Sequence, residues 1–192
     1  MGPSSTHDLD QKLDPRIRRT RKMLQDALAS LLKVKDFDKI SIGDIAEQST
    51  LNRATFYDHY PDKFALLECL VAAQFEDLIA RRKIHFDGCN GAVKSIAMGV
   101  CYYLSESLEP GSEGSRQAGT PMETAIVSVV RGILLEGFAQ HPPRPGVSAQ
   151  LLSSAVAWAI FGAAKEWALN PKRTSISRIS EKITAIIHPM LA

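Results

Sequence analysis

The chain has 192 residues, 45% of them hydrophobic, and a formal net charge of +2 at pH 7. This length suits one domain, or a small domain joined to a larger one, and the hydrophobic fraction is enough for a sizeable core. The net charge is too small to indicate nucleic-acid binding by itself, so the distribution of the charges has to carry any such conclusion.

Cysteine content and hydropathy argue against several other classes. The three cysteines, Cys69, Cys89 and Cys101, are an odd number without a CxxC pair, which disfavours a disulfide framework or a zinc site. The N-terminus lacks the apolar segment of a signal peptide, and the most apolar run, residues 151–164, is too short to span a bilayer. We therefore expect a cytoplasmic protein without membrane contact.

Residues 1–13 are polar and are predicted to form a disordered arm before a first helix that begins near Asp14 and Pro15. Helical spacing puts five apolar residues on one side of that helix: Ile17, Leu24, Leu28, Leu31 and Leu32. Its start carries a basic cluster: Arg16, Arg18, Arg19, Arg21 and Lys22. Such a cluster opposes the helix dipole, and a nearby polyanion would relieve that cost. Alone it would indicate a solvated face, whereas beside a DNA-binding motif it indicates contact with phosphates or the minor groove.

The stretch SIGDIAEQSTLNRATFYDHYPDK, residues 41–63, predicts a helix, a tight turn and a second helix. Apolar positions at helical spacing fall on one face of each helix, so that the two faces can pack together. Ser41 followed by Asp44 predicts an N-cap with a short capping box, and Asn52 predicts the cap of the second helix. With the first helix, this stretch is predicted to form a three-helix domain over residues 14–62.

The outer face of the second helix carries side chains that donate hydrogen bonds. A short helix with such a face fits the DNA major groove. Arg53 and Asn52 are predicted to meet base edges, since arginine favours guanine and asparagine favours adenine. Thr20 and Ser41 are predicted to meet phosphate. The full predicted DNA-binding set is Arg18, Thr20, Ser41, Asn52, Arg53, Thr55, Tyr57, His59 and Lys63.

This region resembles the DNA-binding region of the TetR/AcrR family of bacterial transcription regulators. The resemblance rests on Ser41-Ile42, Asp44-Ile45-Ala46, Leu51-Asn52-Arg53, Thr55-Phe56-Tyr57, His59-Tyr60, Asp62-Lys63 and Leu66-Leu67, and upstream on Arg18-Arg19-Thr20-Arg21 and Ala27-Leu28. It implies phosphate contacts for Tyr57 and Lys63, a homodimer, and a small-molecule site in the C-terminal domain. Family members usually have glycine where this chain has Thr50. A β-branched residue is strained at positive φ, so the turn is expected to differ slightly.

The remainder of the chain reads as helices separated by glycine- and proline-rich breaks over residues 85–91, 109–121 and 141–146. Apolar residues repeating every three or four positions predict helices over 62–83, 92–108, 122–140, 147–169 and from 175 onward. No strand pattern is present. The predicted fold is therefore all-α: the helix-turn-helix domain, followed by a helical ligand-binding and dimerisation domain over residues 63–192.

The helix over 147–169 is apolar almost all round, which indicates burial on both sides, the second against a partner molecule. The last helix carries a short heptad-like seam, which suits either a partner or the chain's own core. The predicted dimer interface joins small residues of the first with this seam: Ala155, Ala159, Gly162, Ala163, Ile176, Ile179, Ile183, Ile186 and Met190.

A ligand pocket is expected on the family resemblance alone, because each candidate residue taken by itself is more often ordinary core. The candidates are Phe75, Met98, Tyr102, Met122, Ile126, Trp158 and Phe161. They would form a mostly apolar cavity with Tyr102 and Trp158 as polar handles. A small apolar or aromatic effector would suit it, and no cofactor is implied.

No catalytic or metal-binding pattern is present: there is no phosphate-cradling glycine loop, no HExxH and no GxSxG, and the histidines lack metal-ligand spacing. The leading hypothesis is therefore a non-enzymatic, homodimeric regulator, a repressor in the first instance, that binds a palindromic double-stranded DNA operator. The alternatives are a helical small-molecule-binding or protein-interaction module with a vestigial helix-turn-helix, which Thr50 favours, and a small helical enzyme.

Overall fold

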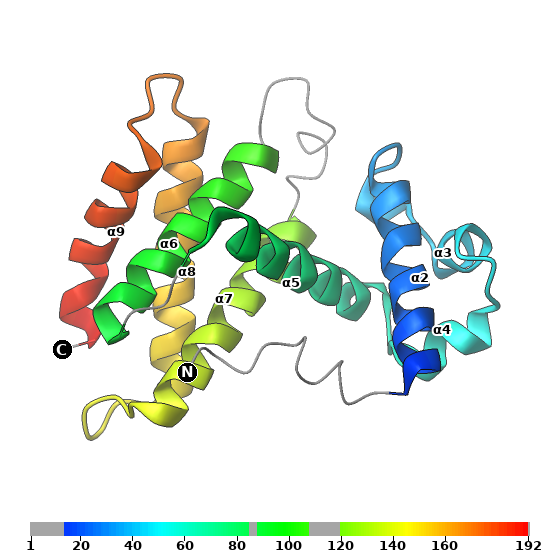
Figure 1. Ribbon diagram of the computed structural model, residues 1–192, viewed down its shortest axis with the longest axis horizontal. Helices are drawn as coiled ribbons and strands as arrows, with labels where there is room; N and C mark the ends of the chain where they lie inside the picture. Colours follow the sequence, from blue (N-terminus) through cyan, green and yellow to red (C-terminus); the bar gives the residue numbers. More distant parts are fainter. Residues whose placement is uncertain (1–13, 85–87, 108–119, 192) are drawn as a thin grey trace.

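The computed structural model describes residues 14–84, 88–107 and 120–191, and every regular element in these ranges is a helix. The all-α prediction is confirmed. The predicted disordered arm over 1–13 and most of the predicted loop over 109–121 lie outside the described residues. Figure 1 shows two groups of helices, α2 to α4 and α6 to α9, with α5 running between them.

The N-terminal group consists of α2 (Pro15–Leu32), a 3-10 turn η1 (Phe37–Lys39), α3 (Ile42–Gln48) and α4 (Arg53–His59). Asp14 caps α2, since its Oδ1 accepts the backbone N–H of Arg16 at 2.8 Å. The helices close over a small core in which Leu24, Leu28, Ile45 and Phe56 are each 0% exposed. The three helices of this group therefore share one small core.

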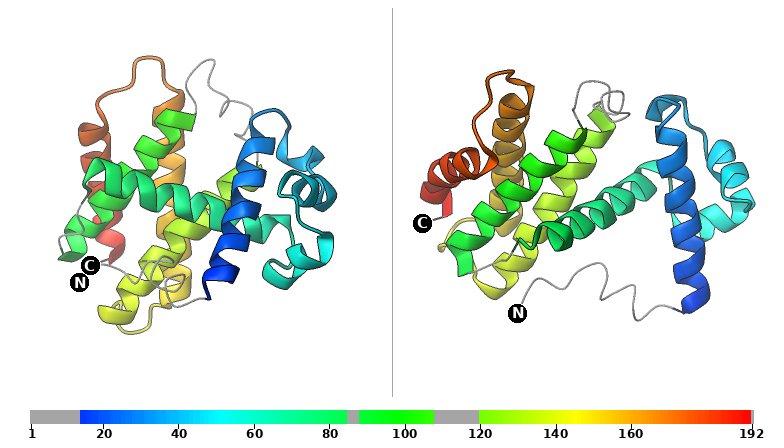
Figure 2. Two further views of the ribbon diagram at one scale, coloured as in Figure 1. Left: turned by 45° about the vertical axis from the view of Figure 1, so that its right-hand side comes forward. Right: turned by 45° about the horizontal axis from the view of Figure 1, so that its top comes forward.

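Helix α5 (Lys63–Arg82) belongs to both groups. Asp62 caps it, because its Oδ1 accepts the backbone N–H groups of Phe64 and Ala65 at 2.9 and 2.8 Å. The helix packs against α2 and against α7 and α6. The right-hand view of Figure 2 shows it crossing from one group to the other. Any movement of one group against the other therefore has to involve α5.

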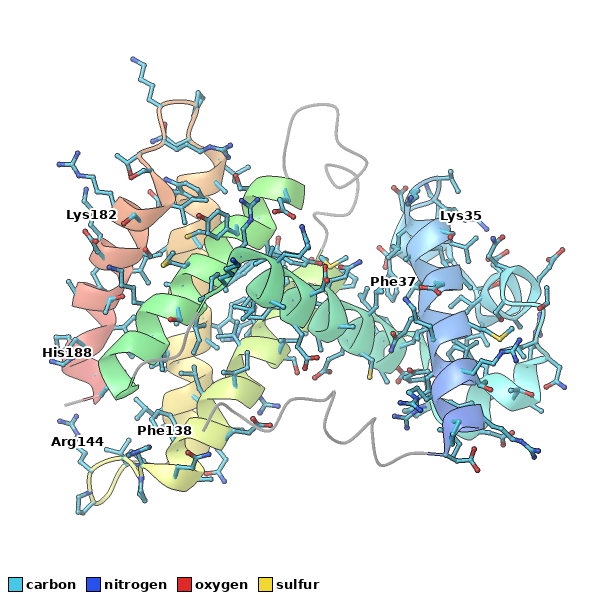
Figure 3. All side chains as sticks on the ribbon, viewed as in Figure 1. Lys35, Phe37, Phe138, Arg144, Lys182 and His188 are labelled. Carbon is cyan, nitrogen blue, oxygen red and sulfur yellow. The ribbon has the colours of Figure 1, made fainter. Side chains whose placement is uncertain are left out.

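The C-terminal group consists of α6 (Gly88–Ser107), α7 (Thr120–Gln140), α8 (Ala149–Leu169) and α9 (Ile176–Leu191). Helix α8 packs against α6, α7 and α9, so it is the centre of the group. Val156, Ala157, Ile160 and Ala164 are fully buried on its inner side. On α9, Lys182 and His188 lie on the exposed side of the helix (Figure 3).

One helix boundary was predicted wrongly. Residues 85–91 were predicted to be a break, but α6 already begins at Gly88. Glycine lowers helix propensity by about 1 kcal/mol relative to alanine, and tertiary packing routinely overrides such a preference. Helix α6 as a whole packs against α8 and α9. Within the described ranges, no helix has the length and hydrophobicity needed to cross a membrane.

Candidate nucleic-acid interface

Helix α4, the predicted recognition helix, is short and anchored at both ends. Asn52 caps it, with its Oδ1 accepting the backbone N–H of Thr55 at 2.7 Å. Phe56 is fully buried and packs edge-on against Tyr57, with ring centroids 5.6 Å apart. Tyr60, at the C-cap, is 3% exposed. Burial of Phe56 and Tyr60 fixes which face of α4 points outward.

Helix α3 begins with the predicted capping box. Asp44 Oδ2 accepts the backbone N–H of Ser41 at 2.7 Å and its hydroxyl at 2.9 Å, and the N–H of Asp44 donates to Ser41 Oγ at 3.1 Å. Lys35 adds an ion pair at 3.1 Å. The hydrogen bonds from Ser41, followed by that from Lys35, lower the pKa of Asp44 to about 2.

This capping box predicts an acid-sensitive domain. The pKa of Asp44 is lower in the folded chain than its ordinary value of 3.8, so the carboxylate stabilises the fold above about pH 4. That contribution is lost as the pH falls from about 4 to about 2. We expect Asp44→Asn to lower the urea midpoint at pH 7 and to flatten its decline over that interval. Asp26→Asn is the matched control, and equal pH profiles for the two variants would contradict the prediction.

The turn between α3 and α4 has the left-handed conformation that glycine normally occupies. Thr50 has φ 57°. Its N–H donates to the carbonyl of Glu47 at 3.0 Å, and the N–H of Leu51 donates to that of Ala46 at 2.9 Å. The backbone of the turn thus keeps the left-handed conformation at Thr50, although this conformation is strained for a β-branched residue. The one feature that favoured a vestigial motif therefore does not prevent the two helices from packing together.

Relief of this strain is measurable. A non-glycine residue in the left-handed region costs about 1–2 kcal/mol, and glycine loses part of that gain through its more flexible unfolded state. We expect Thr50→Gly to raise the free energy of unfolding by about 1 kcal/mol, measured by urea titration. Thr174→Gly, at an exposed loop position without positive φ, is the control and should be neutral or destabilising. A destabilised Thr50→Gly would contradict the strained turn.

The outward face of α4 presents Arg53 and Tyr57, which is 57% exposed. The guanidinium of Arg53 lies against the start of α3: a Cβ atom at Gly43 would be 2.5 Å from Arg53 Nη2. Gly43 thus leaves the space that the arginine occupies. The predicted set did not include Gly43, because its role depends on the crossing of α3 and α4.

Other predicted DNA-binding residues already use their polar groups within the chain. The hydroxyl of Thr20 donates to the carbonyl of Arg16 at 3.0 Å. The Oδ1 of Asn52 accepts the backbone N–H of Thr55, and a bidentate pair with N6 and N7 of adenine would need the same oxygen together with the side-chain nitrogen. The ammonium of Lys63 donates to three backbone carbonyls, at Phe37, Asp38 and Ile40.

The basic residues at the start of α2 have different surroundings in the folded chain. Arg18 is exposed. Arg21 instead lies over the ring of Tyr60, 5.8 Å from its centroid, and so connects α2 to the end of α4. Thr55 and His59 are half-buried on α4. The exposed members of the predicted set are Arg18, Ser41, Asn52, Arg53 and Tyr57.

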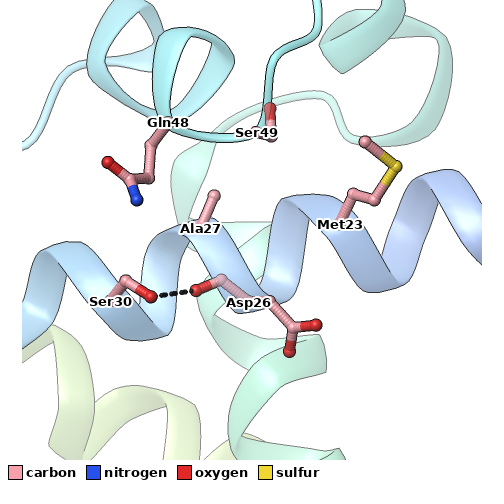
Figure 4. Close-up of a pocket in the computed structure, with 6 residues that line it drawn as sticks. All are labelled: Met23, Asp26, Ala27, Ser30, Gln48 and Ser49. Atoms are coloured by element: carbon pink, nitrogen blue, oxygen red, sulfur yellow. Dashed lines mark hydrogen bonds between the residues drawn. The ribbon is translucent and has the colours of Figure 1, made fainter.

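A pocket of about 280 Å³ opens between α2 and α3. Figure 4 shows its lining residues: Met23, Asp26, Ala27, Ser30, Gln48 and Ser49. None of the predicted ligand-binding residues belongs to it. Those residues lie in α5 to α8, where Phe75, Met122, Ile126 and Phe161 are buried, and Met98 and Tyr102 are half-buried.

Trp158 packs edge-on against Phe161, another predicted ligand-binding residue, with ring centroids 6.2 Å apart. It is 52% exposed, on the outer side of α8. The apolar character of α8 all round gave no indication of which side faces the core, so the exposure of Trp158 did not follow from the sequence. Phe75 is 2% exposed and packs on Gly99, where a Cβ atom would lie 2.6 Å from its Cζ.

The outer side of α8 carries several residues of the predicted dimer interface. Ala155 and Gly162 are exposed, and Leu151 and Leu169 are 71% and 61% exposed. On α9, Ile186 is 66% exposed. The other predicted interface residues of α8 and α9 are half-buried and pack against the chain's own core: Ala159, Ala163, Ile176, Ile179 and Met190.

The exception in the predicted interface is Ile183, which is 1% exposed and packs inside the chain. Its assignment to the interface was wrong, because the same three-and-four spacing serves an intramolecular contact. Ile187, which the prediction left out, is also buried, at 0% exposed. The two isoleucines hold α9 on the core and leave Ile186 on the outer side.

Comparisons with known proteins agree with this geometry. Residues 24–70 match the family of bacterial regulatory proteins, tetR family. A 71-residue segment is 39% identical to the uncharacterized HTH-type transcriptional regulator YxbF of Bacillus subtilis (strain 168). That segment covers 36% of this chain but 19% of the relative, so the chain spans about a fifth of the length of the curated relative that it matches.

Solved structures extend the likeness over nearly the whole chain. Lin0861 from Listeria innocua has a TM-score of 0.65 at 19% identity, over 93% of this chain and 94% of that one. RolR in complex with resorcinol has a TM-score of 0.53 at 18% identity, over 92% and 89%. At such identities the likeness shows the fold. The family match covers residues 24–70, from α2 into α5, so the likeness to bacterial regulatory proteins of the tetR family is shown for the helix-turn-helix region.

Proposed function

We propose that this protein is a homodimeric transcriptional regulator that binds a palindromic DNA operator and acts as a ligand-responsive repressor. The observation that carries the proposal is the geometry of α4. Its cap and the buried Phe56 fix a seven-residue helix with Arg53 and Tyr57 on its outer face. This is the arrangement by which a helix-turn-helix presents side chains to the major groove.

Within this interface the residues take different roles. Arg53 is the base-reading candidate, because a guanidinium pairs with two acceptors of guanine. Tyr57 and Arg18 suit phosphate contacts, which position the protein and make its affinity depend on salt. Asn52 and Ser41 hold the starts of α4 and α3, so their contribution to binding is through the shape of the motif.

The outer side of α8 and α9 suits the dimer interface. A two-fold interface brings the same patch of both subunits together, and exposed alanine and glycine allow close approach of helices. Large apolar side chains on the same side, including Leu151, Trp158 and Ile186, favour burial. Such a dimer would present two copies of α4 to half-sites about 34–36 Å apart.

An effector in the C-terminal group would act through α5. RolR, which shares the fold, holds resorcinol in its structure, and this likeness supports a small aromatic molecule as the effector class. The apolar residues around Phe75, Met122 and Phe161 are suitable contacts for such a ring. A coupling of about 1–3 kcal/mol between effector and DNA is typical and would change operator occupancy appreciably.

Selection of bound sequences from a random DNA pool, with purified protein at near-physiological salt, tests the proposal. We expect an enriched palindrome, which then serves as the probe in a screen for molecules that release the protein. Binding that enriches no sequence and disappears as salt rises would contradict the proposal. That result would favour the alternative hypothesis, a protein-interaction module whose basic N-terminal residues bind DNA without reading its sequence.

A further inference from the structure

Gly43, the second residue of α3, stands at a position where the backbone does not require glycine. Among the described residues, the glycine with positive φ is Gly146, and Gly43 has an ordinary helical backbone. Glycine lowers helix propensity relative to alanine, so alanine would favour α3 at this position. What glycine provides here is therefore space for a neighbouring group.

The side chain of Arg53, the first residue of α4, occupies that space. A Cβ atom at Gly43 would lie 2.5 Å from Nη2, 3.3 Å from Cζ and 3.4 Å from Nε of Arg53. These are its three nearest atoms, so the edge of the guanidinium that carries Nε and Nη2 faces the glycine. The first distance is shorter than a real Cβ contact, and any other residue at this position would displace the guanidinium.

Such a displacement concerns the arginine and leaves the fold intact. The group in the way is the far end of a long, flexible and exposed side chain. At Gly99, by contrast, a Cβ atom would meet the ring of Phe75, which is 2% exposed in the core. A substitution at Gly43 therefore changes where the guanidinium of Arg53 lies without disturbing the packing of α3 on α4.

The contact fixes the direction of Arg53 without using its hydrogen-bond donors. Within the part of the chain that the structure describes, Arg53 has no hydrogen bond or ion pair, whereas Arg81 is paired with Asp77 at 2.7 Å. Residues at the N-terminus of a recognition helix are the ones that meet base edges. A side chain that is already oriented in the free protein loses less conformational freedom on binding.

We propose that Gly43 is a specificity-determining position, at which the absence of a side chain seats the guanidinium of Arg53 over the first turn of α3 and so selects the base pair that this arginine reads. The inference rests on the proposed DNA-binding function and deepens it. Gly43 acts through Arg53 and is a positioning residue. The recognised group is a guanine edge, whose two acceptors a guanidinium pairs with.

Three variants test this role: Gly43→Ala, Arg53→Ala and the protein that carries both changes. Gly132→Ala is the matched control, because Gly132 is a helical glycine of α7 with no atom within 4 Å of its Cβ position. It has the same gain in helix propensity without a neighbour to displace. Urea titration should show that Gly43→Ala is at least as stable as the wild-type protein.

We expect Gly43→Ala to lower affinity for the selected operator by on the order of tenfold, with little change on random DNA at the same salt concentration. Sequence selection with Gly43→Ala should change the palindrome at the position that Arg53→Ala degrades. The protein with both changes should bind the operator as Arg53→Ala does, within about twofold, because the effect of Gly43 requires the arginine. Gly132→Ala should return the wild-type palindrome.

An unchanged palindrome with Gly43→Ala would overturn the inference while the proposed function stands. Losses that add in the protein with both changes would overturn it as well, since Gly43 would then act independently of Arg53. Equal losses on operator and random DNA would have the same meaning.

The seat itself is measured without DNA, from the Nε–Hε signal of Arg53 in nitrogen-15 NMR, identified by its absence from Arg53→Ala. Gly43→Ala should shift this signal and Gly132→Ala should not. An unshifted signal would overturn the seat whatever the DNA results. If the wild-type protein enriches no palindrome, the proposed function and the selection of a base pair both fail, and the NMR signal still decides whether Gly43 seats the guanidinium.

Discussion

Gly162→Arg is expected to convert the proposed dimer into a folded monomer that no longer holds the proposed operator. Gly162 is exposed on the outer side of α8, and a Cβ atom there meets no other atom of the chain within 4 Å. The chain itself therefore accommodates the side chain, and replacing a helical glycine improves helix propensity. Across a two-fold axis, two arginines would occupy the region where the small residues of the partner have to approach.

The expected loss of operator affinity follows from the linkage of two DNA-binding sites in one dimer. Binding of the second half-site is intramolecular in a dimer, and the gain from such linkage is about 10²–10⁴ in affinity. Operator affinity should fall by that order, as measured by fluorescence anisotropy, and sedimentation should report a monomer. The helical circular dichroism should remain that of the wild type.

Gly132→Arg is the matched control for this experiment. Gly132 is an exposed helical glycine of α7, likewise without an atom within 4 Å of its Cβ position. Gly132→Arg changes the net charge and the helix propensity in the same way as Gly162→Arg, but at a position away from the outer side of α8 and α9. A dimeric Gly162→Arg protein with full operator affinity would exclude this surface as the interface.

Arg53→Ala is expected to remove sequence discrimination at one base pair of each half-site. A bidentate arginine–guanine contact is worth about 1–3 kcal/mol of discrimination, so affinity for the selected operator should fall about tenfold to a hundredfold per contact. Random DNA, measured at the same salt concentration, should lose much less. Selection with the variant should return the same palindrome with one position degraded.

The control is Arg131→Ala, which removes an exposed arginine of α7 and so makes the same change in net charge. It should leave both affinities near the wild type. Equal losses on operator and random DNA for Arg53→Ala would mean that the guanidinium binds phosphate. Base reading would then have to come from other residues of α4.

Interactions between residues close in the sequence were sufficient to predict the helices and their caps. Ser41 with Asp44, and Asn52 with Thr55, form side-chain to backbone contacts within three residues, so their geometry follows from chain position alone. The apolar spacing of α2 and α5 likewise indicated which sides of these helices are buried. The all-α fold and the helix-turn-helix could therefore be predicted from the sequence.

The individual site assignments depended on contacts between segments far apart in the chain. Lys63 reads as an exposed cation until the connector, more than twenty residues earlier, brings three carbonyls to its ammonium. Gly43 acquires a role only when α4 crosses α3 and Arg53 lies over it. The spacing of apolar residues within a helix does not predict either of these contacts.

Caps and periodicity are local interactions, so the sequence was enough to predict that this protein is helical, where several of its helices start, and which short helix carries the proposed DNA-reading side chains. Only the tertiary structure decided that Trp158 faces outward, that Ile183 faces the core, and that Lys63 is engaged by the connector. An apolar helix such as α8 has no polar side from which the solvent-exposed side could be predicted. Its orientation follows from the neighbours that pack against it.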